Sequence, residues 1–306
     1  MRLTFIVCPS FHGSTLLHLL LNNHSRISAL GDANPSRAYD QTCACGKEVS
    51  QCEYWQGVLR RLHSDRFEHR RLMLPILPWP LESYRIEGRA LPISRIEPIN
   101  RGVGRAAAAI LDATLPLLWR RGTRRLNDYL QLYSTYYEYV LGLHRTEMIV
   151  DGSKSGRKVA LFARQLPPGD VKVIHLVRDP RGFAASWRHN GEGEDVGAAA
   201  WLWRDIHGRY EALQDVLPYC RVRYEDLASD TQSELERILT FIEMEPQNVI
   251  APPQHPGKHH LMGNRMLFGF DGTVKLDEVW RERLTDEEQR LVLGRAGERA
   301  RKLGYA

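Results

Sequence analysis

Two short segments, far apart in the 306-residue chain, share one pattern. The first occupies residues 5–17 (FIVCPSFHGSTLL) and the second residues 173–187 (VIHLVRDPRGFAASW). In each, an apolar run typical of a buried parallel strand leads through a polar turn into helical spacing. A helix that starts directly after a strand aims backbone N–H groups and the positive end of its dipole at an anion. The sequence therefore predicts a ligand that carries two separate phosphate groups.

The wider pattern predicts an α/β fold with a P-loop-like central parallel sheet flanked by helices. Short apolar runs separated by helical spacing favour parallel strands joined by right-handed crossovers. The expected strands are 2–8, 27–30, 148–151, 171–177 and 219–222. The expected helices outside the block discussed next start at residue 14, after Arg178, and at residues 198, 231 and 286.

One block, residues 65–145, does not follow this alternation. Five prolines between residues 75 and 98 prevent long helices there, and helical spacing returns over 105–119 and 127–144. We expect residues 1–306 to form a single domain in which 65–145 is a helical insertion that shapes the binding site of a second substrate.

Composition excludes several classes of protein. The formal charge of +5, from 42 Lys and Arg against 37 Asp and Glu, suits anionic ligands but is too small for a nucleic-acid-binding surface. No apolar run approaches the roughly 20 residues that span a bilayer, so we expect no membrane span. The first expected strand is reached by Leu3, which leaves no room for a signal peptide, and a cytoplasmic location is the expectation. Oligomeric state has no signature in the sequence.

The turn after the first strand differs from that of nucleotide kinases. Their pattern is Gly-x-x-x-x-Gly-Lys-Ser/Thr, in which the lysine reaches the terminal phosphates and the hydroxyl binds magnesium. Residues 9–15 (PSFHGST) contain one glycine and no lysine. A small-molecule kinase with a degenerate phosphate loop therefore stays as an alternative, as does a non-catalytic nucleotide-binding protein.

In combination, these motifs resemble the sulfotransferases that use PAPS (3′-phosphoadenosine 5′-phosphosulfate), and their bacterial branch in particular. That family has a Gly-Ser/Thr-Ser/Thr turn after its first strand, like residues 13–15, and an Arg followed eight residues later by Ser, like Arg178 and Ser186. Further similar segments, in chain order, are 43–55 (CACGKEVSQCEYW), 151–154 (DGSK), 223–227 (RYEDL) and 259–265 (HHLMGNR) followed by Trp280 and Arg281. The similarity extends from residue 5 to about residue 281, apart from the 65–145 block. Tyrosylprotein and carbohydrate sulfotransferases share some of it.

The resemblance implies a set of nucleotide-binding residues. The loop and helix start would hold the 5′-phosphosulfate, Arg178 and Ser186 would hold the 3′-phosphate, and the C-terminal motifs would complete the site, with 3′,5′-ADP as product. A guanidinium offers a planar fork to phosphate oxygens, and Ser186 lies on the first turns of the next helix. The residues implied are Ser10, Phe11, His12, Gly13, Ser14, Thr15, Leu16, Arg178, Ser186, Tyr224, Asn264 and Arg265.

Catalytic residues are less well defined, because relatives usually carry Lys or Arg where this chain has Phe11. Lys154 is the favoured replacement, since it follows a strand end expected on the same rim of the sheet, and His12 is the alternative. For the base that deprotonates an acceptor hydroxyl we expect Asp32, which follows the second strand where some relatives place a glutamate. His12 is again the alternative, because imidazole titrates closest to pH 7. We interpret His175 as a core histidine.

The expected reaction is an in-line transfer of a sulfuryl group to a hydroxyl of a small molecule or polymer, and it needs no metal. The acceptor class stays open among carbohydrates, lipids, peptide tyrosine and secondary metabolites. Five cysteines, an odd number, argue against a disulfide framework. Cys43, Cys45 and Cys52 suggest zinc but lack an obvious fourth ligand, with His63 the nearest choice, so a loop with free thiols or one disulfide is favoured.

Overall fold

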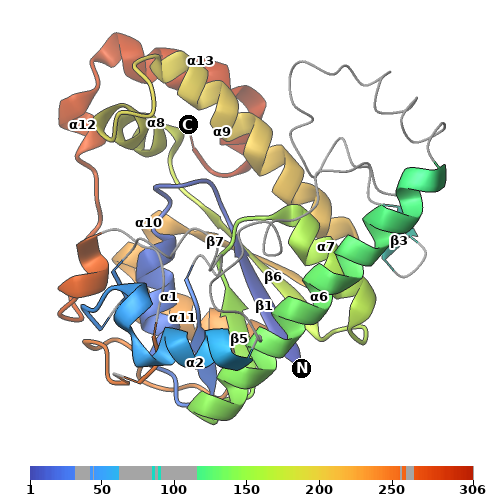
Figure 1. Cartoon of the computed structure of the whole chain (residues 1–306). Helices are drawn as coiled ribbons and strands as arrows, with labels where there is room; N and C mark the ends of the chain where they lie inside the picture. Colours follow the sequence, from blue (N-terminus) through green and yellow to red (C-terminus); the bar gives the residue numbers. More distant parts are fainter. Residues whose placement is uncertain are drawn as a thin grey trace.

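A five-stranded parallel sheet in the order β2-β5-β1-β6-β7 forms the centre of the protein (Figure 1). The computed structural model describes residues 1–31, 42–43, 45–61, 85–86, 89–90, 116–255, 257–259 and 265–305. The strands of the sheet are β1 (Arg2–Val7), β2 (Ile27–Ala29), β5 (Met148–Asp151), β6 (Val171–Val177) and β7 (Tyr219–Arg223). Every pairing between them is parallel. The predicted fold class and the five predicted strands are thus confirmed.

Helices cover both faces of this sheet, as the alternation of side chains along β1 requires. Leu3, Phe5 and Val7 pack into one apolar cluster, whereas Ile6 packs into another on the opposite face. The first cluster includes residues of α2 (Glu53–Arg61), α6 (Pro116–His144) and α7 (Gly156–Gln165). The second includes residues of α1 (Ser14–Asn22), α10 (Tyr224–Ser229) and α11 (Thr231–Phe241).

A separate group of helices packs together beyond the carboxyl end of β6, at the top of Figure 1. These are α8 (Pro180–His189), α9 (Val196–Glu211), α12 (Trp280–Arg283) and α13 (Asp286–Lys302). Trp203 of α9 is fully buried among them, and its indole N–H donates to the carbonyl of Arg178 at 3.0 Å. This helix group therefore fixes the backbone just after β6.

Only part of the 65–145 block lies within the described residues. It contains β3 (Arg85–Ile86), β4 (Arg89–Ala90), which pair antiparallel, and α6. The helix expected over 127–144 is the C-terminal part of α6, which already begins at Pro116. Most of the helix expected over 105–119 lies outside the described residues. Three short 3₁₀ helices, η2 (Val49–Gln51), η4 (Ala212–Asp215) and η5 (Arg265–Phe268), complete the elements.

A buried ion pair joins β5 to the helix that follows it. The Nζ of Lys158 lies 2.7 Å from Oδ2 of Asp151, and both side chains are almost completely buried. The hydroxyl of Tyr137 donates to the same carboxylate oxygen, and the ammonium lies 3.6 Å from the ring centroid of Tyr133. Burial raises the pKa of Asp151, but the combined effect of Lys158 and the hydrogen-bond donors is larger and lowers the pKa below its usual value. The carboxylate is therefore charged at neutral pH.

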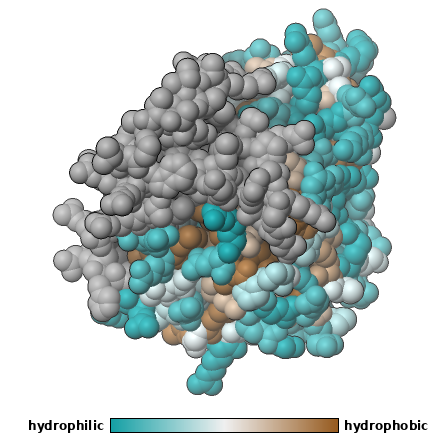
Figure 2. Space-filling view, turned by 90° about the vertical axis from the view of Figure 1, so that its right-hand side faces the viewer, coloured by the Kyte–Doolittle hydropathy of each residue, from teal (hydrophilic) through white to brown (hydrophobic). Residues whose placement is uncertain are grey.

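Hydrophilic side chains make up most of the described surface on the side that carries α6 and α7, with apolar ones visible among them near the centre of the view (Figure 2). Among the helices that the structure describes, none combines the length and apolar character that a membrane span needs.

Candidate nucleotide site

The loop between β1 and α1 has the backbone geometry of an anion-binding turn. Phe11 and Gly13 both adopt positive φ, 63° and 84°, which turn the chain sharply into α1. Helix α1 begins at Ser14, and its first amides point out of the helix start toward the carboxyl edge of the sheet. A Cβ on Gly13 would lie 2.6 Å from a ring carbon of Tyr224. Glycine is therefore required here both by the backbone angle and by the aromatic ring packed against it.

Arg178 connects this loop to the turn after β6. Its Nη1 donates to the carbonyl of Phe11 at 2.7 Å, and its Nη2 donates to the Asp277 carboxylate at 2.9 Å. The guanidinium also lies over the ring of Tyr224, 4.7 Å from the centroid. The two loops meet because β1 and β6 are neighbours in register, with Val7 opposite His175. The two segments in which the sequence predicts phosphate binding thus lie side by side at the carboxyl edge of the sheet.

Asp277 completes the surroundings of Arg178, and sequence reasoning missed it. Its backbone N–H donates to the hydroxyl of Tyr224 at 3.0 Å, and its carboxylate accepts from the N–H of Val279 at 3.1 Å. Burial raises the pKa of Asp277, but the neighbouring Arg178 lowers it below its usual value overall. The only sequence signal nearby is the Trp280–Arg281 pair, because a lone aspartate in a loop has no distinctive pattern.

Helix α8 has a glycine, Gly182, where it packs against the Arg178 guanidinium. Asp179 caps the helix by accepting from the N–H of Arg181 at 2.7 Å. A Cβ on Gly182 would lie 3.0 Å from Nε of Arg178, so the absence of a side chain there leaves room for the arginine. Ser186 is half-buried and lies one turn farther along the helix, on the same face as Gly182. Arg178, which is buried, and Ser186 therefore both lie beside Gly182 on this face of α8.

His12 is completely buried and takes part in a chain of hydrogen-bonded histidines. Its Nδ1 lies 2.8 Å from the carbonyl of Ser10, and its Nε2 lies 2.9 Å from Nε2 of His207. The Nδ1 of His207 lies 2.7 Å from Nε2 of His175, whose Nδ1 bonds the hydroxyl of Tyr219. Because a carbonyl only accepts, His12 Nδ1 must donate, and every other hydrogen then points from Tyr219 toward His12. Three neutral imidazoles satisfy the whole chain.

This arrangement gives His12 a structural position. Burial lowers the pKa of His12 to about 3, and burial also lowers the pKa values of His175 and His207 well below the usual value. Both ring nitrogens of His12 are engaged, so it has no lone pair for an acceptor hydroxyl. The prediction that His175 is a core histidine agrees with its place in this chain, and His207 is a partner that sequence reasoning missed.

Lys154 and Phe11 differ in their relation to the loop. Lys154 follows β5, is half-buried and has a positive φ of 56°, and its carbonyl accepts from the hydroxyl of Tyr210 at 2.7 Å. Its charge is close enough to lower the pKa values of His12 and His18, on which burial has the larger effect. The Phe11 ring packs instead against Phe183 of α8, with centroids 6.5 Å apart. No cation replaces Phe11 in the loop itself, whereas Arg178 contacts the loop at the Phe11 carbonyl and the charge of Lys154 acts on His12.

The other predicted residues have varied positions. Ser10 is exposed, Ser14 and Thr15 are half-buried at the helix start, and the side chain of Leu16 is buried in the core, so only its backbone amide is available to a ligand. Asp32, Asn264 and His63 lie outside the described residues, as does the side chain of Arg265. A cavity of about 830 Å³ between α9, η4 and α13 is lined by none of the predicted site residues.

Comparison with known proteins gives one family model that matches part of the chain. Residues 126–248 match the model of a sulfotransferase family, and this range includes Lys154, Arg178, Ser186 and Tyr224. No curated protein sequence is similar enough to be matched.

Among solved structures, the chain is similar to the sulfotransferase domain of the olefin synthase of Synechococcus PCC 7002, with 16% identity over 100% of this chain and 94% of that one and a TM-score of 0.47. It is also similar to the sulfotransferase domain of the curacin biosynthetic pathway, with 15% identity, 100% and 98% coverage and a TM-score of 0.47. A third similar structure is sulfotransferase STF9 of Mycobacterium avium, with 14% identity over 100% of this chain and 77% of that one and a TM-score of 0.44. The family model, over residues 126–248, confirms the resemblance to the sulfotransferases that the sequence motifs predicted.

Proposed function

We propose that this sulfotransferase takes its sulfuryl group from PAPS and transfers it to a hydroxyl of an acceptor. The observation that carries the proposal is the contact of Arg178 with the carbonyl of Phe11, at 2.7 Å. It joins a helix start suited to one phosphate with a guanidinium suited to another. A nucleotide phosphorylated on both its 3′ and 5′ sides fits this pair of sites, whereas a nucleotide with one chain of phosphates uses only one of them.

In this proposal the amides from Gly13 to Leu16, with the hydroxyls of Ser14 and Thr15, bind the 5′-phosphosulfate. Arg178 and Ser186 bind the 3′-phosphate, and the Tyr224 ring, which already packs on Gly13 and under the guanidinium, supports both. Burial raises the pKa of Tyr224, so its hydroxyl stays neutral and keeps its bond to the Asp277 amide. The roles of Asn264 and Arg265 at the nucleotide remain part of the proposal.

The transfer itself needs placement and charge stabilisation more than covalent help. The acceptor oxygen attacks sulfur in line, the bond from sulfur to the 5′-phosphate oxygen breaks, and 3′,5′-ADP leaves. The N-terminus of α1 stabilises the charge on the leaving phosphate. Lys154 is the proposed cation beside the leaving phosphate, because Lys154 lies close enough to His12 of the loop for its charge to lower the pKa of that histidine. The scheme uses no metal.

Asp32 is the proposed base for the acceptor proton. It directly follows Gly31, whose carbonyl accepts from the N–H of Gly152 at 2.7 Å, so the chain enters this segment from the carboxyl edge of the sheet. His12 is a weaker choice, because both of its ring nitrogens are already bonded. The acceptor, a small molecule or polymer with a free hydroxyl, and a cytoplasmic location also stay within the proposal.

The test is titration calorimetry of 3′,5′-ADP, 5′-AMP and ATP against the wild type and Arg178→Ala. A hydrogen bond to a charged group contributes about 1.5–3 kcal/mol, so the variant should bind 3′,5′-ADP roughly ten- to a hundredfold more weakly. Its affinity for 5′-AMP should change little. Arg188→Ala is the matched control, because Arg188 lies on the same helix but bonds Glu288 at 2.6 Å.

Three outcomes separate the hypotheses. Preference for 3′,5′-ADP that disappears in Arg178→Ala supports the proposed donor site. Equal or tighter binding of ATP contradicts it and favours the kinase, which would also require Mg²⁺. Tight binding of 3′,5′-ADP without turnover of PAPS on any hydroxyl acceptor favours the non-catalytic alternative, for which the loss of a cation at Phe11 is the main argument.

A further inference from the structure

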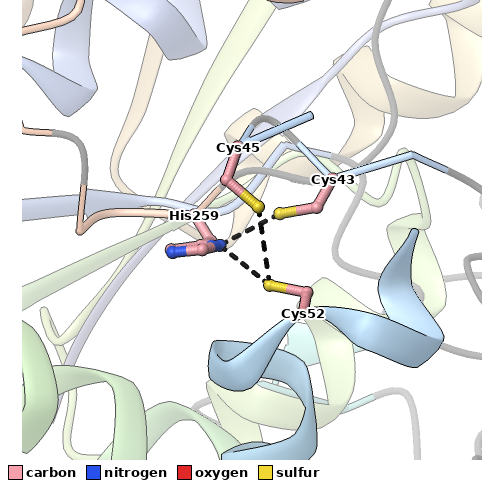
Figure 3. A group of neighbouring side chains, drawn as sticks. All are labelled: Cys43, Cys45, Cys52 and His259. Carbon is pink, nitrogen blue, oxygen red and sulfur yellow. Dashed lines mark hydrogen bonds between the residues drawn. The ribbon is translucent and has the colours of Figure 1, made fainter. Parts of the chain in front are cut away.

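Three cysteines and one histidine converge at a place that the proposed reaction does not use. The ligand atoms of Cys43, Cys45, Cys52 and His259 all lie within 4.8 Å of one another (Figure 3). Nδ1 of His259 is 3.0 Å from Sγ of Cys43 and 3.2 Å from Sγ of Cys52, and the sulfurs of Cys45 and Cys52 are 3.7 Å apart. His259 thus lies where the fourth ligand that the cysteine spacing lacked would be.

We propose that these four residues bind a structural Zn²⁺ ion. Three thiolates and one imidazole form a donor set that zinc takes in closed tetrahedral sites. With Zn–S near 2.3 Å and Zn–N near 2.0–2.1 Å, a tetrahedron separates two sulfurs by about 3.8 Å and a sulfur from a nitrogen by about 3.6 Å. The observed separations, from 3.0 to 4.8 Å, bracket these values. Shifts of about 1 Å or less bring all four atoms onto one ion.

The backbone around the cysteines is already arranged for thiolates. The N–H of Cys43 donates to the carbonyl of Lys47, and the N–H of Gly46 donates to the carbonyl of Cys43, both at 2.8 Å, which closes a tight turn. Gly46 has a φ of 82°, an angle that glycine accommodates without strain. The backbone N–H groups of Cys45, Lys47 and Trp55, the last in the first turn of α2, lie close to the sulfurs of Cys43, Cys45 and Cys52, respectively. Such N–H groups stabilise metal-bound sulfur.

His259 is held in place from both sides. Its ring stacks on Tyr54, with centroids 4.6 Å apart and an interplanar angle of 3°. The adjacent Lys258 places its ammonium on three backbone carbonyls, including those of His24 at 2.6 Å and Ile27 at 2.7 Å. A segment 207 residues away from Cys52 is therefore anchored where its imidazole meets the cysteines.

Charge and access also suit the ion. On binding Zn²⁺, the three thiols release their protons to solvent, and the complex of three thiolates, one neutral imidazole and one dication carries a net charge of −1. Lys47 lies close enough to His259 to interact with it electrostatically, and Lys258 is adjacent to His259 in the sequence. These two cations offset the net charge of −1 on the complex. A pocket of about 710 Å³, lined by Cys45, Cys52 and His259 among others, provides a path for the ion.

A disulfide explains the cluster less well. None of the five cysteines, all of which the structure describes, forms a disulfide, and a bond between Cys45 and Cys52 would shorten their separation from 3.7 Å to about 2.05 Å. A disulfide would involve only two of the three sulfurs, and it would not account for the position of Cys43 next to His259. The ion, in contrast, uses all four groups and fastens the cysteine loop to the segment that leads into residues 260–265. This proposal is independent of the donor and of the acceptor.

The test measures metal rather than activity. The protein, purified with a thiol reductant and without chelator, should contain one Zn²⁺ per chain by inductively coupled plasma mass spectrometry. Exchange with Co²⁺ should produce the intense visible d–d bands of a tetrahedral site and a thiolate charge-transfer band. His259→Ala should lose at least nine-tenths of the metal and lower Tm, whereas His259→Cys, which supplies a fourth thiolate, should retain both metal and Tm. Cys220→Ser, which alters a cysteine remote from the cluster, should match the wild type.

Wild-type protein with less than a tenth of an equivalent of zinc and no tetrahedral cobalt spectrum would overturn the proposal, as would a Cys45–Cys52 disulfide in intact protein under non-denaturing, thiol-blocking conditions. Both measurements use the wild type, so they decide the question even if a variant fails to fold. Full zinc occupancy in His259→Ala would equally exclude His259 as a ligand.

Discussion

Acidification is the perturbation to which this structure should respond most strongly. His12, His207 and His175 form one buried, neutral chain, and burial lowers the pKa of His12 to about 3 and the pKa values of the other two well below the usual value. Arg178 and Lys154 add to this effect on His12, and Arg299 and Arg221 add to it on His175 and His207. In the unfolded chain each imidazole titrates near pH 6.5.

The sign and size follow from proton linkage. Above about pH 6.5 these histidines are neutral in both states, so their contribution to stability is complete. As the pH falls below 6.5, the unfolded chain binds three protons that the folded protein excludes, and the free energy of unfolding decreases by about 4 kcal/mol per pH unit. At pH 4.5 the loss is between about 2 and 3 kcal/mol per histidine, or about 8 kcal/mol for all three. A typical domain has only about 5–15 kcal/mol in total, so we expect unfolding between about pH 4 and 5.

Urea unfolding followed by circular dichroism at intervals between pH 4.5 and 8 measures this dependence directly. His18 and His144, whose pKa values burial lowers to about 4 each, steepen the wild-type curve in the same direction. His207→Gln isolates the effect of one buried imidazole, and it should reduce the slope by one proton, about 1.4 kcal/mol per pH unit. Exposed His189→Gln is the matched control and should leave the slope unchanged. A wild-type slope of one proton or less, or parallel curves for His207→Gln and the wild type, would refute the reasoning.

Two further predictions concern charges at the carboxyl edge of the sheet. Asp277→Asn keeps an acceptor for the Val279 amide but removes a negative charge 2.9 Å from Arg178. A negative charge a few ångströms from a phosphate costs about 1 kcal/mol per phosphate charge even in water. We therefore expect about tenfold tighter binding of 3′,5′-ADP by calorimetry. Weaker binding, as in Arg178→Ala, would mean that Asp277 positions the arginine instead. Lys158→Met leaves the Asp151 carboxylate buried without its cation and should lower the free energy of unfolding by about 3–5 kcal/mol in urea titrations. Adding Asp151→Asn should recover much of that loss, and no recovery would show that the pair is not coupled.

The local sequence was sufficient to predict the sheet and the two loops at its edge. Strands β1 and β6 are short apolar runs flanked by turn residues, and burial on both faces produces that pattern irrespective of the rest of the chain. Gly13 and Arg178 could be predicted as site residues for the same reason, because each lies in the turn that follows such a strand. The prediction of zinc stopped at three cysteines, since His259 is 207 residues beyond Cys52 and no local pattern links the two.

The missed residues have their roles through contacts between distant segments. Asp277 matters because it meets Arg178, 99 positions earlier, and His207 matters because it lies between His12 and His175. The role of His12 changed for this reason: as part of a loop it resembled a base, but burial removed its charge and two neighbours occupied its nitrogens. Short-range periodicity thus records which face of a strand or helix is buried. The protonation state and the partners of a polar group depend on what the folded chain brings against it, and that information is spread over residues far apart in the sequence.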